Sequence, residues 1–262
     1  MTIFHGLILG IIEGLTEFLP ISSTAHMILA SAWLKIPTTE FLKTFEISIQ
    51  LGAILAVVIL YWKKIWSSWD LIFKIGAAFI ATSIIGLIFY KVVKAYLMEN
   101  MILIASALLL GGILIIAWEK YYAKKQAAIQ ESPEQPMSYR QAIVIGACQA
   151  LAMIPGVSRS AATILGGLSL GLKRKTIIEF SFLLAIPTMA AATGLDLLKS
   201  RASLMTLSGQ EIIIWLIGFA TAFLTAIIGV KFFLRFIQKN DFVAFGWYRI
   251  ILGLIVLAWL FV

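Results

Sequence analysis

The chain has 262 residues, of which 61% are hydrophobic and only 13% are charged. Soluble domains are about half apolar and about a quarter charged, so this composition excludes an ordinary soluble domain. The net charge of +8 does not indicate a nucleic-acid partner, because the basic residues cluster at the ends of apolar segments, where they anchor membrane proteins to anionic headgroups. The apolar runs are continuous rather than alternating, which favours helices over a transmembrane barrel. We therefore predict an all-α integral membrane protein.

Taken in chain order, the predicted elements are six spanning helices, two interrupted apolar regions and one polar linker. The six segments long enough to cross a bilayer as helices are 41–62, 72–93, 101–122, 176–198, 211–234 and 242–262. A polar linker over 123–137 separates the third span from the rest of the chain.

The two interrupted regions, about 3–34 and about 138–172, are broken by Pro20 and by Pro155-Gly156. Each half is too short to cross a bilayer alone. We predict that both regions are re-entrant hairpins, with two short helices that enter and leave on one side. The alternative is a single kinked spanning helix. Polar residues follow both breaks, which favours the hairpin, because a broken helix can line a water-filled cavity but cannot face lipid.

The linker divides the chain into halves that resemble each other. Gly10-Ile-Ile-Glu13-Gly-Leu aligns with Gly146-Ala-Cys-Gln149-Ala-Leu, and the same offset places Ser22 on Ser158 and Thr24 on Ser160. Each half, 1–122 and 138–262, then contains one hairpin followed by three spans. Because three is odd, we predict an inverted-topology repeat, an architecture that places a site near the midplane between its halves.

The distribution of basic residues predicts the orientation. Loops near 63–74, 120–140, 173–175 and 231–239 carry 13 Lys and Arg residues, whereas the loops on the other side carry six. The more basic side is expected to be cytoplasmic. Both termini then face outward, the first hairpin opens outward and the second opens to the cytoplasm.

The second break places an arginine among hydroxyl groups. Arg159 lies between Ser158 and Ser160, and Thr163 follows one turn later. An arginine at membrane depth needs an anionic partner, and its planar fork suits phosphate. The alternative is that Arg159 pairs with a carboxylate of the first hairpin, Glu13 or Glu17, and only holds the hairpins together. The many hydroxyl groups favour phosphate binding.

The first break places two carboxylates on one helical face. Glu13 and Glu17 are four residues apart, a spacing at which both side chains point the same way. Such a pair can hold a hard divalent cation, Mg²⁺ or Ca²⁺, through oxygen. Alternatively, repulsion between the carboxylates prepares one of them for acid or base catalysis.

Hydroxyl groups and an imidazole follow Pro20. Ser22, Ser23 and Thr24 supply hydroxyl groups, and we predict that Ser22 and Thr24 bind phosphate together with Ser158, Ser160 and Thr163 of the second break. His26 lies three residues after Ser23. On a helix this spacing brings His26 within reach of Ser23, so we predict Ser23 as nucleophile with His26 as its proton partner. The rival is direct attack by water, with Ser23 only holding the phosphate.

Other charges within the apolar segments are assigned a bracing role. Glu46 and Glu179 are repeat mates, and either one is expected to pair with Arg249 in the last span.

The residues around both breaks resemble the undecaprenyl-diphosphate phosphatase family of the bacitracin-resistance type. The motifs are Glu-Gly-Leu-Thr-Glu-Phe-Leu-Pro-Ile-Ser-Ser-Thr-x-His over 13–26 and Pro-Gly-x-Ser-Arg-Ser-x-x-Thr over 155–163. The resemblance extends through Phe45-Glu46, Gln50-Leu-Gly, Glu179-Phe-Ser-Phe-Leu, Ala185-Ile-Pro and Tyr248-Arg249. The chain departs from the family at Ala25 and Ala161, where glycine is usual, and at Ala81, where proline is common. We expect the two former changes to narrow the hairpin turns.

The resemblance implies an enzyme that removes one phosphate from undecaprenyl diphosphate and so recycles the lipid carrier of cell-wall synthesis. It implies dependence on a divalent cation and an outward-facing site in the bacterial plasma membrane. The catalytic residues that carry over are Glu13, Glu17, Ser23, His26 and Arg159. The expected partners are a polyprenyl diphosphate lipid and the bilayer, with no nucleic acid and with a homodimer left open. The alternative function is a polyprenyl-phosphate transporter or flippase, because inverted repeats with broken helices are also a transporter architecture.

Overall fold

The computed structural model describes residues 1–96, 100–131, 133, 136–205 and 207–261, and these form helices and connecting loops without a strand. The first half contains α1 (Ile3–Thr16), α2 (Ser23–Trp33), α3 (Glu40–Trp66), α4 (Trp69–Tyr96) and α5 (Met101–Glu131). The second half contains α6 (Tyr139–Ala150), a 3₁₀ turn η1 (Leu151–Met153), α7 (Arg159–Ser169), α8 (Arg174–Lys199), α9 (Arg201–Leu204), α10 (Gly209–Ile237) and α11 (Val243–Leu260).

Six of the described helices are long and apolar enough to cross a membrane, namely α3, α4, α5, α8, α10 and α11. They correspond one to one with the six predicted spans. Each contains at least 18 residues, and at 1.5 Å per residue this length is close to the thickness of the hydrocarbon core. The chain is therefore a multi-pass membrane protein.

The polar linker predicted over 123–137 begins as a continuation of α5, which ends at Glu131. Eight of the nine residues over 123–131 are alanine, lysine, glutamine or glutamate, and all four are strong helix formers. Positions 132, 134 and 135 of the predicted linker lie outside the described residues.

Both interrupted regions are pairs of short helices rather than single kinked helices. Helices α1 and α2 pack against each other, as do α6 and α7. The breaks fall where the prolines predicted them, at 17–22 and at 151–158. We call these two connecting segments, together with the first two residues of the helix that follows each, the first tip (17–24) and the second tip (151–160).

Matching serines begin the second helix of each pair. Ser22 and Ser158 have left-handed φ values of 70° and 71°, and the hydroxyl oxygen of each accepts from the backbone N–H three residues later. Serine is a preferred N-cap because it satisfies one of the free N–H groups of the first turn. Ala25 and Ala161 are the third residues of these helices, and the expectation that they narrow the turns stays a prediction.

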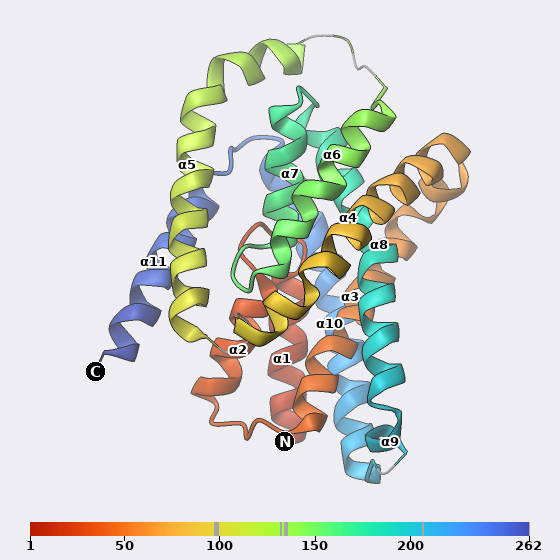
Figure 1. The fold of residues 1–262 in the computed structure, drawn as a ribbon, viewed down its shortest axis with the longest axis vertical. Helices are drawn as coiled ribbons and strands as arrows, with labels where there is room; N and C mark the ends of the chain where they lie inside the picture. Colours follow the sequence, from red (N-terminus) through yellow and green to blue (C-terminus); the bar gives the residue numbers. More distant parts are fainter. Residues whose placement is uncertain (97–99, 132, 134–135, 206, 262) are drawn as a thin grey trace.

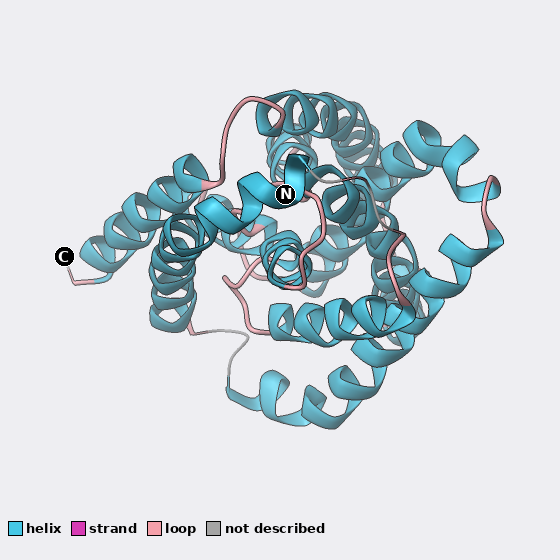
Figure 2. Ribbon diagram, turned by 90° about the horizontal axis from the view of Figure 1, so that it is seen from above, coloured by secondary structure: helices cyan, strands magenta, loops and turns pink. Residues whose placement is uncertain are grey.

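The two helix pairs approach each other from opposite ends of the molecule, and their tips meet near its middle (Figure 1). Seen along the long axis, the long helices lie around the connecting loops (Figure 2). Helix α1 packs on α10, α6 packs on α4, α5 packs on α11, and α3 packs on both α8 and α10.

Both chain termini lie at the lower end of the molecule in Figure 1, and the loops joining α7 to α8 and α10 to α11 lie at the upper end. Successive spanning helices therefore place their connecting loops at alternate ends of the molecule. The count of basic residues on each side assumed this order.

Candidate active site

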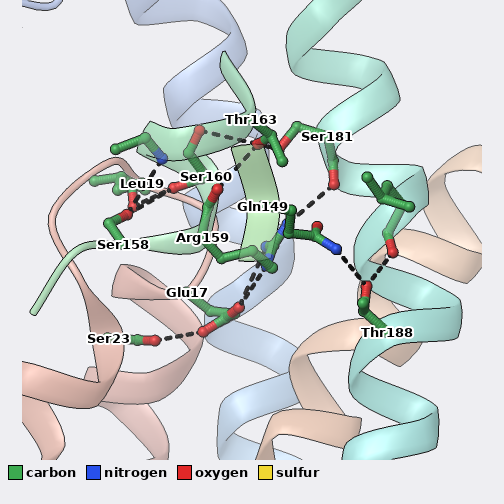
Figure 3. Close-up of polar contacts among 12 residues, drawn as sticks. Glu17, Leu19, Ser23, Gln149, Ser158, Arg159, Ser160, Thr163, Ser181 and Thr188 are labelled. Atoms are coloured by element: carbon green, nitrogen blue, oxygen red, sulfur yellow. Dashed lines mark hydrogen bonds and ion pairs between the residues drawn. The ribbon is translucent and has the colours of Figure 1, made fainter. Parts of the chain in front are cut away.

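The first and second tips are joined by a three-residue contact among Glu17, Ser23 and Arg159 (Figure 3). Glu17 directly follows α1, Ser23 begins α2, and Arg159 begins α7. The guanidinium of Arg159 donates from Nε and Nη2 to Oε1 of Glu17, at 3.3 and 3.2 Å. The hydroxyl of Ser23 donates to the other oxygen, Oε2. The carboxylate of Glu17 therefore forms hydrogen bonds with one residue from each tip.

The ion pair between Arg159 and Glu17 is largely buried, with the two side chains 12% and 6% exposed. Arg159 also donates from Nη1 to the backbone oxygen of Ser181 in α8, at 3.0 Å. Of the two alternatives considered for Arg159, the pairing with a carboxylate of the first hairpin is present, and its partner is Glu17. The same fork-shaped guanidinium is also suited to phosphate oxygens.

The hydroxyl groups around Arg159 are engaged within the protein. Ser158 Oγ lies 3.2 Å from Ser160 Oγ, and Ser160 Oγ donates to the backbone oxygen of Leu19 in the first tip, at 2.7 Å. Thr163 Oγ1 lies 2.6 Å from Ser181 Oγ of α8. Ser160 and Thr163 are fully buried, and their hydroxyls join α7 to Leu19 and to Ser181 of α8. Their phosphate-binding role stays a prediction.

In the first tip, the two other predicted phosphate ligands have different surroundings. Ser22 is buried and its hydroxyl oxygen caps α2, whereas Thr24 is exposed.

The carboxyl group of Glu13 is fully buried, and neither of its oxygens has a hydrogen-bond partner among the described residues. The backbone N–H of Glu17 bonds the backbone oxygen of Glu13, so the helical spacing continues through Glu17 and places both carboxyl groups on one side of α1. Buried carboxylates are costly unless they are paired or bind a cation. The described residues contain no cluster of three or more acidic, histidine or cysteine side chains that could hold a metal ion. A metal bound at Glu13 and Glu17 would therefore need further ligands of another kind, such as hydroxyl, backbone or substrate oxygens.

His26 is not paired with Ser23, contrary to the expectation. Its Nδ1 lies 2.7 Å from the backbone oxygen of Ser22, and its Nε2 lies 2.7 Å from the hydroxyl of Tyr248 in α11. The hydroxyl of Ser23 points instead to Glu17, because a carboxylate is a stronger acceptor than an imidazole.

Arg249 is the residue whose role the sequence reasoning missed. It is fully buried in α11 and donates to five backbone oxygens. Its acceptors are Pro20 in the first tip at 3.2 Å, Gly156 and Val157 in the second tip at 2.8 and 3.1 Å, and Ala107 and Leu108 in α5 at 3.0 and 3.3 Å. One side chain thus holds both tips and α5 together.

The expected pairing of Arg249 with a glutamate is wrong. Glu46 accepts from the hydroxyl of Ser31 at 2.7 Å, and Glu179 forms an ion pair with Lys64. The signal that was available in the sequence is an arginine in the middle of an apolar span, a costly position that usually has a function.

A comparison with protein families matches residues 6–255 to the family described as Bacitracin resistance protein BacA. The chain belongs to this family. The matched range includes both tips and every residue of the contact described above.

Similar proteins come from several bacteria. A protein of Wolinella succinogenes named undecaprenyl-diphosphatase is 51% identical over 99% of both chains. A protein of the same name from Aquifex aeolicus is 49% identical over 97% of both chains, and one from Bdellovibrio bacteriovorus is 45% identical over the whole of this chain and 97% of its own. The family resemblance predicted from the motifs is confirmed.

Proposed function

We propose that the chain is an integral-membrane phosphatase that hydrolyses undecaprenyl diphosphate to undecaprenyl phosphate and inorganic phosphate. The observation that carries this proposal is the contact among Glu17, Ser23 and Arg159 where the two tips meet, in a member of the BacA family. Similar relatives are named for the same hydrolysis. The comparisons give no support to the transporter or flippase alternative.

Arg159 would bind the terminal phosphate group. Its guanidinium already spans Glu17 and the backbone of Ser181, so its donors are held at fixed positions in the absence of substrate. Phosphate oxygens would accept from this fork, and preorganised donors of this kind stabilise the charge that develops during phosphoryl transfer.

Glu17 is the best-placed proton acceptor for Ser23, since the hydroxyl already donates to it. Ser23 Oγ would attack the terminal phosphorus, and its proton would pass to Glu17. The bond from that phosphorus to the bridging oxygen breaks, and the electron pair leaves with undecaprenyl phosphate. Water then hydrolyses the phosphoserine to release phosphate and restore Ser23.

The rival for this step is direct attack by water, with Ser23 only holding the phosphate. Rapid quenching of a single turnover, with the label in the terminal phosphate, separates the two routes. The serine route predicts acid-stable label on the peptide containing Ser23, and a good signal without such label would favour water.

Glu13 and Glu17 would hold a divalent cation, Mg²⁺ or Ca²⁺. Support comes from the two buried oxygens of Glu13, which have no hydrogen-bond partner within the described part of the chain, and from the preference of both cations for hard oxygen donors. A bound cation would neutralise negative charge on the diphosphate.

The two halves of the chain, 1–122 and 138–262, would form an inverted repeat. Helix α1 packs on α10 of the other half as α6 packs on α4. Matching threonines bridge these contacts: Thr225 Oγ1 lies 3.3 Å from the backbone oxygen of Gly10, and Thr82 Oγ1 lies 2.7 Å from that of Gly146. Because Gly10 and Gly146 are aligned in the sequence repeat, this correspondence supports a twofold relation between the halves.

Within that repeat, the helix pairs α1–α2 and α6–α7 would be re-entrant hairpins with their tips at membrane depth. The count of 13 against six basic residues supports a site that opens outward from the bacterial plasma membrane, toward the side that holds both termini.

Phosphate release by the purified protein in detergent tests the proposed function. Wild-type protein should release phosphate from a polyprenyl diphosphate in the presence of Mg²⁺ or Ca²⁺, and Glu13→Gln should raise the cation concentration required. Glu40→Gln is the matched control, since Glu40 lies in the exposed first turn of α3. A folded wild-type protein that releases no phosphate under any of these conditions would contradict the proposal.

A further inference from the structure

His26 is held from both sides by groups that lie far apart in the sequence. Its Nδ1 lies 2.7 Å from the backbone oxygen of Ser22, and its Nε2 lies 2.7 Å from the hydroxyl of Tyr248, 222 residues away in α11. The two rings are nearly parallel, with 5° between their planes and 5.6 Å between their centroids. This offset stacking is a favourable arrangement for aromatic rings.

These contacts determine where the ring protons are. A carbonyl oxygen can only accept a hydrogen bond, so Nδ1 must carry the hydrogen that points to Ser22. In the neutral ring Nε2 then has a lone pair and accepts from the hydroxyl of Tyr248. In the protonated ring Nε2 carries a hydrogen and donates to the same oxygen. A hydroxyl group can do both, so Tyr248 can hold His26 in either protonation state.

Tyr248 is itself fixed by its neighbour in the chain. Arg249 is fully buried and bonds the backbone of both tips, whereas the Tyr248 side chain is 43% exposed. The tyrosine is therefore anchored next to the tips without being part of the buried core. Its hydroxyl group has one described contact, which is His26.

We propose that Tyr248 is a positioning residue for His26: while the Ser22 carbonyl keeps the hydrogen on Nδ1, the Tyr248 hydroxyl holds the ring at Nε2, both with and without a proton on that nitrogen. This inference rests on the proposed function and adds to it a role for His26 Nε2 in transferring a proton to or from the reacting oxygens. Tyr248 acts through His26 and is not assigned a contact with the substrate.

A double-mutant cycle tests this assignment, because it measures whether two residues act through each other. Tyr248→Phe keeps the ring and removes only the hydroxyl. It should lower kcat by about tenfold, the order expected for one hydrogen bond, and leave KM nearly unchanged. In a His26→Ala background the same substitution should have no further effect. Tyr121→Phe is the control, since Tyr121 is 82% exposed on α5.

Nitrogen NMR of the imidazole in detergent gives a readout that does not depend on turnover. The chain has two histidines, so His5→Gln leaves His26 as the only ring observed. The spectrum should show hydrogen on Nδ1, and Tyr248→Phe should shift the Nε2 signal, because the contact of that nitrogen with the hydroxyl is lost.

Three results would overturn the inference: full activity of Tyr248→Phe, an equal loss in both backgrounds, or a ring with hydrogen on Nε2 alone. These results are distinct from failure of the proposed function, which would appear as wild-type protein that releases no phosphate. If Tyr248→Phe does not fold, the tautomer of the His5→Gln protein still decides the assignment.

Discussion

At the scale of single residues, Glu17 connects the chemistry of the two tips. It accepts from Ser23 of its own hairpin and from Arg159 of the other. The membership of these residues in the candidate site could be predicted, because ionisable groups are conspicuous in an apolar sequence. Their partners could not, since Ser23 is within helical reach of His26 and also near Glu17. The choice between those acceptors depends on side-chain directions that spacing does not determine.

Replacing Arg159 by lysine tests the assignment of this residue to phosphate. Arg159→Lys keeps the charge but loses the fork that reaches Glu17 and Ser181. We expect phosphate release to fall by about 10²-fold or more, the loss typical when one preorganised donor is removed. Arg140→Lys, at an exposed position, should behave like wild type. Normal turnover by Arg159→Lys would remove Arg159 from the site.

At the scale of elements, α11 holds the broken helices in place through Arg249. The breaks could be predicted from Pro20 and Pro155 together with the polar residues that follow them, because proline disfavours a helix interior. Pro187, which lies in an apolar segment, does not interrupt α8. The five hydrogen bonds of Arg249 could not be predicted, because their acceptors are backbone oxygens, which every residue has. For the same reason the sequence suggested a glutamate partner for Arg249 that the structure does not contain.

A methyl group added in α5 should disturb the hydrogen bonds of the Arg249 guanidinium. A Cβ at Gly111 would overlap the guanidinium of Arg249, whereas a Cβ at Gly76 in α4 would meet no atom within 4 Å. Gly111→Ala should therefore lower stability by ~1–3 kcal/mol, the usual cost of overpacking, and reduce activity. Gly76→Ala should do neither. Thermal unfolding in detergent measures the stability of both variants. Equal melting temperatures would show that the Arg249 guanidinium does not need the space beside Gly111.

At the scale of the whole molecule, the six spanning helices were predictable because each is a long apolar run. The observed helix boundaries differ from the predicted ones by a few residues. The largest difference is the extension of α5 into the predicted linker, where strong helix formers continue the helix. The way in which α1 packs on α10 and α6 on α4 depends on contacts between distant segments. The repeat in the sequence suggested a relation between the halves without specifying these pairs.

The predicted orientation can be tested by cysteine labelling after Cys148→Ala. Lys35 lies in the exposed loop between α2 and α3, and Lys239 lies in the exposed loop between α10 and α11. A membrane-impermeant thiol reagent should label Lys35→Cys in intact cells and label Lys239→Cys only after the membrane is opened. The reverse pattern would invert the topology and place the opening of the first hairpin in the cytoplasm.

The most direct test of the central claim compares two buried serines of α2. Ser23 donates to Glu17 at the meeting point of the tips, and Ser31 donates to Glu46 two turns away. Phosphate release from a polyprenyl diphosphate should fall by about 10²-fold or more in Ser23→Ala, as expected for a group that takes part in the chemical step. Ser31→Ala should stay close to wild type. Equal activity of the two variants would contradict a phosphatase site at the junction of the tips.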